Sequence, residues 1–292
     1  MIHRDKEKFS KLVYRIASLT GFYAPLIEKD YYLTFFLSKI NELSDNLIFK
    51  GGTCLNKIYY SYYRLSEDLD FSMCLPDYTT TRGNRRKCIQ SVKDNIGNFA
   101  KQFDMRIDGA ENAGRNVSKQ YVYYLAYDSV LLPSEQMVKF EVSLRYNPIS
   151  NPEIKNVQHK FLNPFTQEPL FDGGKVKCLS LKEIVSEKLR ASAIRQVIAP
   201  RDFYDLDFII RQGFNLADEM VMNLFKKKLK EDNCDPDLAK YKFNLGRSDE
   251  EIKGMELRIE NELFDVLTVS ERKNFDLCIA LKRINKVMGE VA

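Results

Sequence analysis

The sequence predicts an α+β fold in its first part and a helical bundle behind it. Every segment with strand-like alternation of apolar and polar residues lies before residue 180, and the pattern is helical from there on. Between the two parts, the stretch 147–174 holds four of the nine prolines and a Gly-Gly pair, which is typical of a connection between domains. We therefore expect two domains in this chain of 292 residues, 1–178 and 179–292.

The elements follow from the spacing of apolar residues. Steps of three and four predict a helix over 5–20 and a second from Pro25 to about Leu43. A short apolar strand at 47–50 then enters a Gly-Gly turn, and Thr53 is expected to cap the next helix. The further predicted elements are strands at 68–73, 121–127 and 137–144, a helix through 89–99, and helices from Ser180 onward, the first opened by a Ser180–Glu183 capping box.

Composition excludes several classes of protein. The net charge is only +4, from 45 Lys+Arg against 41 Asp+Glu, which excludes a histone-like general coat for DNA. No apolar run is long enough for a membrane-spanning helix and the start is too charged for a secretory signal, so we expect a cytoplasmic protein without membrane contact. His3 and His159 lie in no motif and no C-x-x-C pair occurs. The chemistry is therefore expected to use carboxylates, Lys and Arg.

Asp68 and Asp70 form the first candidate site. They alternate with Leu69 and Phe71 on a predicted strand, so both carboxylates lie on one face and repel each other unless a cation binds. Oxygen ligands select Mg²⁺ or Mn²⁺. Glu141 lies on the polar side of another strand and would be a third ligand if that strand were adjacent. The alternative is a pair of exposed surface aspartates.

Gly51, Gly52 and Thr53 form a second candidate site between a strand and a helix. Two glycines let the backbone approach a phosphate closely. The segment matches neither the P-loop nor the Rossmann pattern, and an ordinary turn is the alternative.

A third candidate site lies on the helix that begins near residue 181. Lys188 and Arg195 are two helical turns apart and could neutralise a triphosphate, unless they only form a solvated basic face. Asp202 and Asp205 follow at a spacing of three and could hold either cation in place.

Taken in order, these pieces resemble the AbiEii-type nucleotidyltransferase toxins of the DNA-polymerase-β-like superfamily. The resemblance spans residues 28 to about 210, and the last eighty residues carry no matching motif. The matching segments are Glu28-Lys29-Asp30-Tyr31, Lys50-Gly51-Gly52-Thr53-x-Leu55, Arg64-x-Ser66-Glu67-Asp68-Leu69-Asp70-Phe71, Lys188 with six residues to Arg195, and Arg201-Asp202-x-x-Asp205-Leu206.

The resemblance implies a polymerase-β-like nucleotidyltransferase core with a mixed sheet, followed by a helical bundle. It implies an NTP substrate and Mg²⁺, transfer of NMP to an acceptor with the tRNA 3′ end expected, and a cognate antitoxin encoded nearby that need not bind the toxin. It also implies roles for single residues. Asp68, Asp70 and Glu141 would hold the metal; Gly51, Gly52, Thr53, Lys188 and Arg195 would bind the nucleotide; Asp202 or Asp205 would order the basic pair or assist catalysis; Ser66 would contact substrate or only cap a turn.

Other functions stay open at this point. The acceptor could be a protein or a small molecule, or the chain could be a catalytically silent nucleic-acid-binding protein. Basic runs at 82–87 and 226–228 would favour RNA if they flank the cleft, and otherwise serve solubility. The aromatic run 59–63 could stack bases, although core packing is the favoured interpretation. Oligomeric state and the preferred NTP are not predicted.

Overall fold

The chain folds as two compact units. The computed structural model describes residues 1–76, 81–108, 115–241 and 245–290. The first unit comprises Met1–Leu179 and the second Ser180–Ala292. The proline-rich stretch 147–174 belongs to the first unit. No helix in the described ranges is long and apolar enough to cross a membrane.

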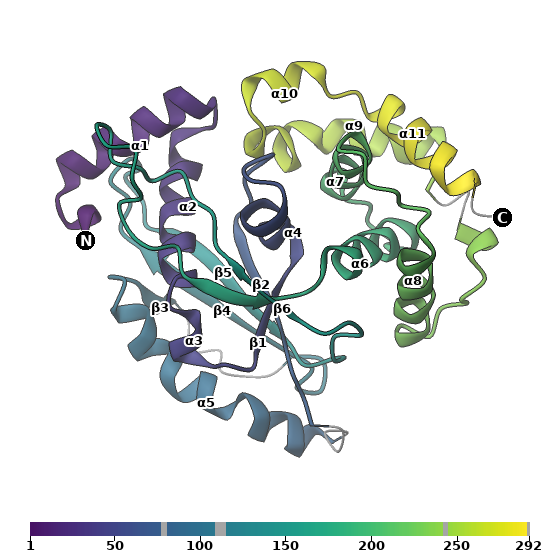
Figure 1. Ribbon diagram of the computed structural model, residues 1–292, viewed down its shortest axis with the longest axis horizontal. Helices are drawn as coiled ribbons and strands as arrows, with labels where there is room; N and C mark the ends of the chain where they lie inside the picture. Colours follow the sequence, from purple (N-terminus) through teal and green to yellow (C-terminus); the bar gives the residue numbers. More distant parts are fainter. Residues whose placement is uncertain (77–80, 109–114, 242–244, 291–292) are drawn as a thin grey trace. The chain divides into compact units, whose positions relative to one another are not determined.

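A mixed sheet forms the centre of the first unit (Figure 1). Its seven described strands have the order β3-β4-β5-β2-β1-β7-β6. The pairs β2–β5 and β1–β7 are parallel, and the other neighbours are antiparallel. The α+β class with a mixed sheet is therefore confirmed. The strands are β1 (Leu47–Lys50), β2 (Asp68–Met73), β3 (Arg106–Asp108), β4 (Gln120–Tyr127), β5 (Gln136–Ser143), β6 (Glu153–Asn156) and β7 (Lys175–Cys178).

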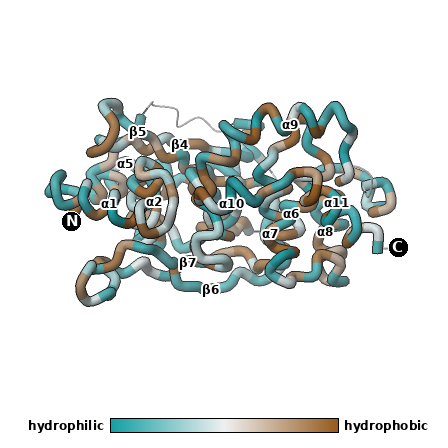
Figure 2. Tube along the Cα trace, turned by 90° about the horizontal axis from the view of Figure 1, so that it is seen from above, coloured by the Kyte–Doolittle hydropathy of each residue, from teal (hydrophilic) through white to brown (hydrophobic). Residues whose placement is uncertain are grey.

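Three of these strands were not predicted: β7 and the two edge strands, β3 and β6. β3 and β6 are short and lie at the two edges of the sheet. Neither carries enough apolar side chains to show a periodic pattern, and the tube of β6 is mostly hydrophilic in Figure 2. Pairing with a neighbouring strand, rather than local sequence, makes these segments strands.

Helices pack against one face of the sheet through aromatic side chains. Phe36 contacts Phe99 and Phe140 at ring-centroid distances of 4.8 and 5.6 Å, which joins α2, α5 and β5. The predicted second helix is two helices, α2 and α3, separated at Ser38 and Lys39; the Ser38 hydroxyl donates to the Phe35 carbonyl at the end of α2. The helices are α1 (Lys6–Thr20), α2 (Ala24–Leu37), α3 (Ile40–Leu43), α4 (Gly51–Cys54) and α5 (Arg82–Lys101).

The segment after β1 differs from its prediction at both ends. Helix α4 begins at Gly51, so Thr53 lies inside the helix and the prediction that it caps the helix is wrong. A π-helical stretch, Leu55–Tyr59, follows. Tyr62 and Tyr63 are buried, which confirms core packing as the role of this end of the aromatic run.

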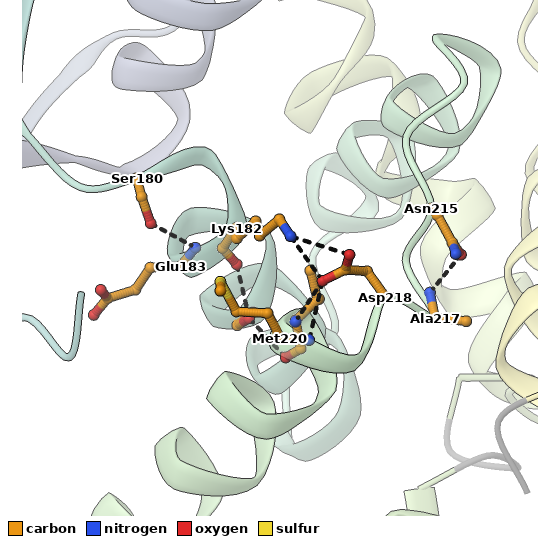
Figure 3. A network of polar contacts seen from close by, with 9 residues as sticks. Ser180, Lys182, Glu183, Asn215, Ala217, Asp218 and Met220 are labelled. Atoms are coloured by element: carbon orange, nitrogen blue, oxygen red, sulfur yellow. Dashed lines mark hydrogen bonds and ion pairs between the residues drawn. The ribbon is translucent and has the colours of Figure 1, made fainter. Parts of the chain in front are cut away.

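The second unit is helical throughout its described part. Helices α6 and α8 begin side by side (Figure 3): the Ser180 hydroxyl accepts from the Glu183 N–H, and Lys182 Nζ lies 3.0 Å from both carboxylate oxygens of Asp218, which caps α8. The Ser180 half of the predicted capping box is thus present, whereas the Glu183 carboxylate pairs with buried Lys228 at 2.8 Å. The helices are α6 (Leu181–Ile194), α7 (Pro200–Arg211), α8 (Glu219–Glu231), α9 (Asp249–Glu262), α10 (Val269–Asn274) and α11 (Leu277–Gly289).

A buried ion pair ties α2 to the π-helical stretch. Lys57 Nζ lies 2.6 Å from Asp30 Oδ1, and both side chains are almost completely buried. The same ammonium group donates to Thr34 Oγ1 at 2.7 Å, and the Tyr62 hydroxyl donates to Asp30 Oδ2. Burial lowers the pKa of Lys57, and the charge of Asp30 opposes that shift. Each charge is tolerated because the other is present.

Lys57→Met should therefore destabilise the protein strongly. It leaves the Asp30 carboxylate buried without its cation, which typically costs about 3–5 kcal/mol of unfolding free energy. The double variant Lys57→Met/Asp30→Asn should recover a large part of that loss. Urea denaturation measures both, with Lys11→Met, which removes an exposed ion pair, as the control that leaves stability unchanged. A stable Lys57→Met single variant would contradict this account.

Candidate active site

The Gly51-Gly52 turn packs directly against charged side chains. Gly51 has φ +77°, and a Cβ there would lie 2.6 Å from Asp70 Oδ2. At Gly52, a Cβ would lie 2.5 Å from an Arg64 guanidinium nitrogen and 3.3 Å from Ser66 Oγ. Gly51 therefore requires glycine, because its φ is positive and the Asp70 carboxylate lies beside it, whereas a side chain at Gly52 would have to displace the Arg64 guanidinium. The turn is part of the same site as Asp70.

Strand pairing brings the third predicted carboxylate next to the first two. Asp68 and Asp70 alternate along β2, and β2 pairs in parallel with β5. In that register Asp70 lies opposite Glu141, and Asp68 lies opposite Lys139. The predicted adjacency of the two strands is thus confirmed.

The electrostatics of Asp70 reflect this crowding. Desolvation is the larger cause and repulsion from Glu141 and Asp68 the smaller, and together they raise the pKa of Asp70 to about 6. A half-buried carboxyl group beside two others is suited to a cation, so the chemistry of Asp68 and Asp70 fits the divalent ion that the sequence predicts. Glu141 is engaged differently: Lys139 Nζ lies 2.7 Å from one of its oxygens and Gln120 Nε2 donates to the other at 2.6 Å.

Glu141 would have to leave Lys139 to bind a metal directly. In the ranges that the structure describes, no three His, Cys, Asp or Glu side chains are gathered as a ready metal site. Its role as a third ligand stays a prediction.

Thr53 and Ser66 lie at the site in different ways. The Thr53 hydroxyl is buried and donates to the backbone carbonyl of Asp68, so it anchors the start of β2 to α4. Ser66 is half-buried and its hydroxyl lies beside Gly52. Between these two, Ser66 is the one placed where a ligand at the glycine turn could reach it.

Lys188 and Arg195 share a carboxylate within the second unit. Lys188 Nζ lies 2.7 Å from Asp202 Oδ1 and 2.7 Å from Asp205 Oδ2. Arg195 follows the last residue of α6 and donates to the other oxygen of Asp202 at 2.8 Å. The predicted contacts between the aspartates and the basic pair are therefore present. Asp202 and Asp205 are buried, whereas about half of the Arg195 side chain is exposed.

Two residues of this region were given no role from sequence. The Arg64 guanidinium is buried, lies beside Gly52 and stacks 5.6 Å from the ring centre of Tyr63. Lys57, in the π-helical stretch that follows α4, forms the buried ion pair with Asp30. The sequence around Lys57 gives no sign that it is buried, and its partner Asp30 is 27 residues away. Spacing alone does not reveal such pairs.

The region 28–31 acts as a scaffold. Glu28 is buried and accepts from Ser129 Oγ and the Val130 N–H, each at 2.6 Å, while Asp30 holds Lys57. Burial raises the pKa of Glu28. The two acidic side chains of this segment thus fix the loop at 129–130 and the π-helical stretch.

Asp70→Asn should stabilise the protein in buffer without divalent ions. The folded-state pKa of about 6 lies above the value near 3.9 of an unfolded chain, so the folded state holds the extra proton between these values and stability falls as pH rises through them. At pH 7.5 the amide removes that penalty, which amounts to at most about 3 kcal/mol. Urea melts in EDTA at pH 4.5 and 7.5 check this: the gain should be present at pH 7.5 and small at pH 4.5. Equal effects at both pH values would refute it.

Gly51→Ala should lower Tm, because it adds a Cβ at positive φ against the Asp70 carboxylate, a combination worth about 1–3 kcal/mol. Gly97→Ala is the matched control. Gly97 lies in α5 with nothing within 4 Å of its Cβ position, so that change should be neutral or raise stability by about 0.5–1 kcal/mol. Thermal unfolding compares them, and a Gly51 variant as stable as the Gly97 variant would contradict the geometry of the turn.

Comparisons with known proteins agree with this arrangement. The family model described as "Nucleotidyl transferase AbiEii toxin, Type IV TA system" matches residues 36–280. Solved structures with the same fold include the nucleotidyltransferase toxin MenT4 from Mycobacterium tuberculosis (TM-score 0.60, 17% identity, 97% of this chain and 98% of that one) and a putative nucleotidyltransferase from Helicobacter pylori (0.55, 16%, 92% and 96%). JHP933 from Helicobacter pylori is also similar (0.51, 16%, 92% and 93%). No curated protein matches the sequence significantly.

At these identities the structural likeness shows the fold alone, whereas the family model covers most of the chain. The ordered motifs, the carboxylates beside the glycine turn and the matched residues lead to one assignment. The chain belongs to the AbiEii family of nucleotidyltransferase toxins and is a nucleotidyltransferase.

Proposed function

We propose that this enzyme transfers NMP from an NTP to the 3′ end of an RNA, with tRNA as the expected acceptor. The observation that carries the proposal is the placement of Asp70 against the Gly51-Gly52 turn and beside Glu141. Close backbone approach for phosphates and paired carboxylates are the two features that in-line nucleotidyl transfer needs.

Each residue of the first unit has a definite role in the proposal. Asp68 and Asp70 hold Mg²⁺ or Mn²⁺, which when bound supplies positive charge to the reacting phosphates. Gly51 and Gly52 bring backbone N–H groups to the β- and γ-phosphates, and Ser66 contacts the nucleotide beside Gly52. The Thr53 hydroxyl keeps α4 attached to β2. Glu141 would become the third ligand by giving up its ion pair with Lys139 and binding the metal instead.

The second unit contributes the cations. Lys188 and Arg195 neutralise the triphosphate, and Asp202 with Asp205 positions them through the contacts described above. The acceptor hydroxyl attacks the α-phosphorus, a new P–O bond forms, and the bond to pyrophosphate breaks. Holding both reactants in line is the main contribution of the protein to such a step.

Two other functions remain in competition. Transfer to a protein or a small molecule would use the same residues with a different acceptor. A catalytically silent nucleic-acid-binding protein is the weaker alternative, because the sequence retains Asp68, Asp70 and Lys188. We further propose that the toxin acts in the cytoplasm and that its antitoxin is encoded nearby; the description of its family as part of a toxin-antitoxin system supports the existence of an antitoxin.

Labelling with each α-³²P NTP in turn tests the acceptor. Purified protein, Mg²⁺ and total bacterial RNA are incubated and resolved on a denaturing RNA gel beside a protein gel. Label on RNA of tRNA size is the expected result. Label on protein alone, or no label from folded protein, would reject an RNA acceptor.

Asp68→Ala/Asp70→Ala should reduce transfer at least about 10³-fold, because losing several kcal/mol of transition-state stabilisation has that effect. Lys188→Ala should reduce it at least about 10²-fold. Asp94→Ala, an exposed aspartate of α5, is the control and should retain full activity. Transfer by the folded double variant at the wild-type rate would refute the assignment of the carboxylates.

A further inference from the structure

Seven of the chain's cations gather in three short segments without acidic residues. Residues 81–87 contain four Lys or Arg, residues 115–119 contain two, and residues 144–146 contain one, with no Asp or Glu in any of them. The whole chain is nearly balanced, with 45 basic and 41 acidic residues, so this concentration is a local feature. We name its exposed members the basic edge: Arg82, Arg86, Lys87, Arg115, Lys119 and Arg145.

Hydrogen bonds join the three segments into one surface. Arg82 Nε donates to Ser118 Oγ at 3.4 Å, and Arg85 donates to the Val117 carbonyl at 3.1 Å, which connects the start of α5 to the turn before β4. The Leu144 N–H donates to the Lys119 carbonyl at 2.8 Å, which connects that turn to the end of β5. The cations therefore lie together where β4 begins and β5 ends.

The turn at the centre of this surface is strained. Asn116, Val117 and Ser118 all have positive φ, at 49°, 57° and 60°. A β-branched residue rarely adopts that conformation, which costs of order 1–3 kcal/mol. The Val117 side chain is nonetheless 63% exposed, among the cations. An exposed Tyr146 follows Arg145, so apolar and aromatic groups alternate with positive charge. That mixture is typical of a surface for single-stranded nucleic acid.

The basic edge is connected to the carboxylate site. Gln120, the first residue of β4, donates to Glu141, which lies opposite Asp70. Arg145 lies four residues after Glu141 and two residues beyond the end of β5, a separation of about 13 Å for an extended chain. A stacked nucleic-acid strand rises ~3.4 Å per nucleotide, so about four nucleotides span this distance.

We propose that the basic edge binds the phosphates of an RNA acceptor a few nucleotides before its 3′ end. This inference rests on the proposed function in naming RNA as the acceptor. Exposed cations bind phosphates with strong salt dependence and little sequence preference, and Val117 and Tyr146 provide apolar contact for bases. The Lys run at 226–228 does not form a comparable surface, since Lys228 is buried among Glu183, Glu187 and Glu231.

Direct binding tests the proposal without any transfer. The probe is a 5′-fluorescein RNA hairpin with a four-nucleotide single-stranded 3′ overhang, and anisotropy gives its Kd for the full-length protein between 50 and 200 mM salt. Arg86→Gln/Lys119→Gln/Arg145→Gln should weaken binding about 10- to 100-fold at 50 mM salt and lower the slope of log K against log salt by about 2. None of these three side chains belongs to the carboxylate site.

The matched control is Lys226→Gln/Lys227→Gln/Lys230→Gln, which removes the same charge from exposed positions of α8 and should change Kd less than twofold. Thermal unfolding confirms that both triple variants fold, and single Lys119→Gln and Arg145→Gln variants replace the triple if it does not. Wild-type binding by the basic-edge variant, or equal losses in both triples, would overturn the proposal. So would equal displacement of the RNA by poly-glutamate, which would assign the surface to acidic polypeptides.

The same measurements separate this proposal from the proposed function. Wild-type protein that binds the hairpin through the basic edge but labels no RNA would support the surface and reject RNA as acceptor. Wild-type protein that labels RNA while the basic-edge variant keeps the wild-type KM for RNA would support the function and overturn the surface. A raised KM for RNA with unchanged kcat is the result expected if both are correct.

Discussion

The parallel pairing of β2 with β5 places Asp70 beside Glu141, and the carboxylate site depends on that register. Asp68, Asp70 and Glu141 repel one another, and this repulsion adds to desolvation in raising the pKa of Asp70. On the opposite face of the same two strands, Phe71 and Phe140 pack at 5.4 Å between ring centres, and apolar burial there offsets the repulsion. The site is thus held in an electrostatically unfavourable state by a core that has no part in the chemistry.

The residues around the glycine turn divide into those that hold the turn and those that face a ligand. Asp30, Lys57 and Thr53 are buried and engaged with other parts of the first unit. Gly51 and Gly52 lie against the Asp70 carboxylate and the Arg64 guanidinium, which leave little space for a side chain at either position. The residues of the glycine-turn motif therefore do not all face a ligand. The buried ones fix the backbone of the turn, and a fixed backbone is what close approach to a phosphate requires.

In the second unit, buried carboxylates fix the position of two cations. Lys188 and Arg195 meet one buried aspartate, and Asp205 adds a second contact to Lys188. Lysine alone is flexible, and two carboxylates restrict where its ammonium group can lie. Removal of either aspartate would change the position of the cation as well as its charge.

The sequence by itself determined the helices and strands whose apolar residues recur at a regular spacing. Alternation defined β2 and β5, periodicity defined the long helices, and the ordered motifs identified the family and the three groups of candidate residues. Helix ends, the edge strands β3 and β6, and the π-helical stretch were decided by tertiary contacts, because their sequences carry little or no periodic signal. The same holds for single charges: Lys57 and Lys228 look like surface lysines in the sequence, yet both are buried by carboxylates from distant helices. Burial of a charge depends on a partner that only the folded chain brings close, and so it cannot be inferred from spacing along the chain.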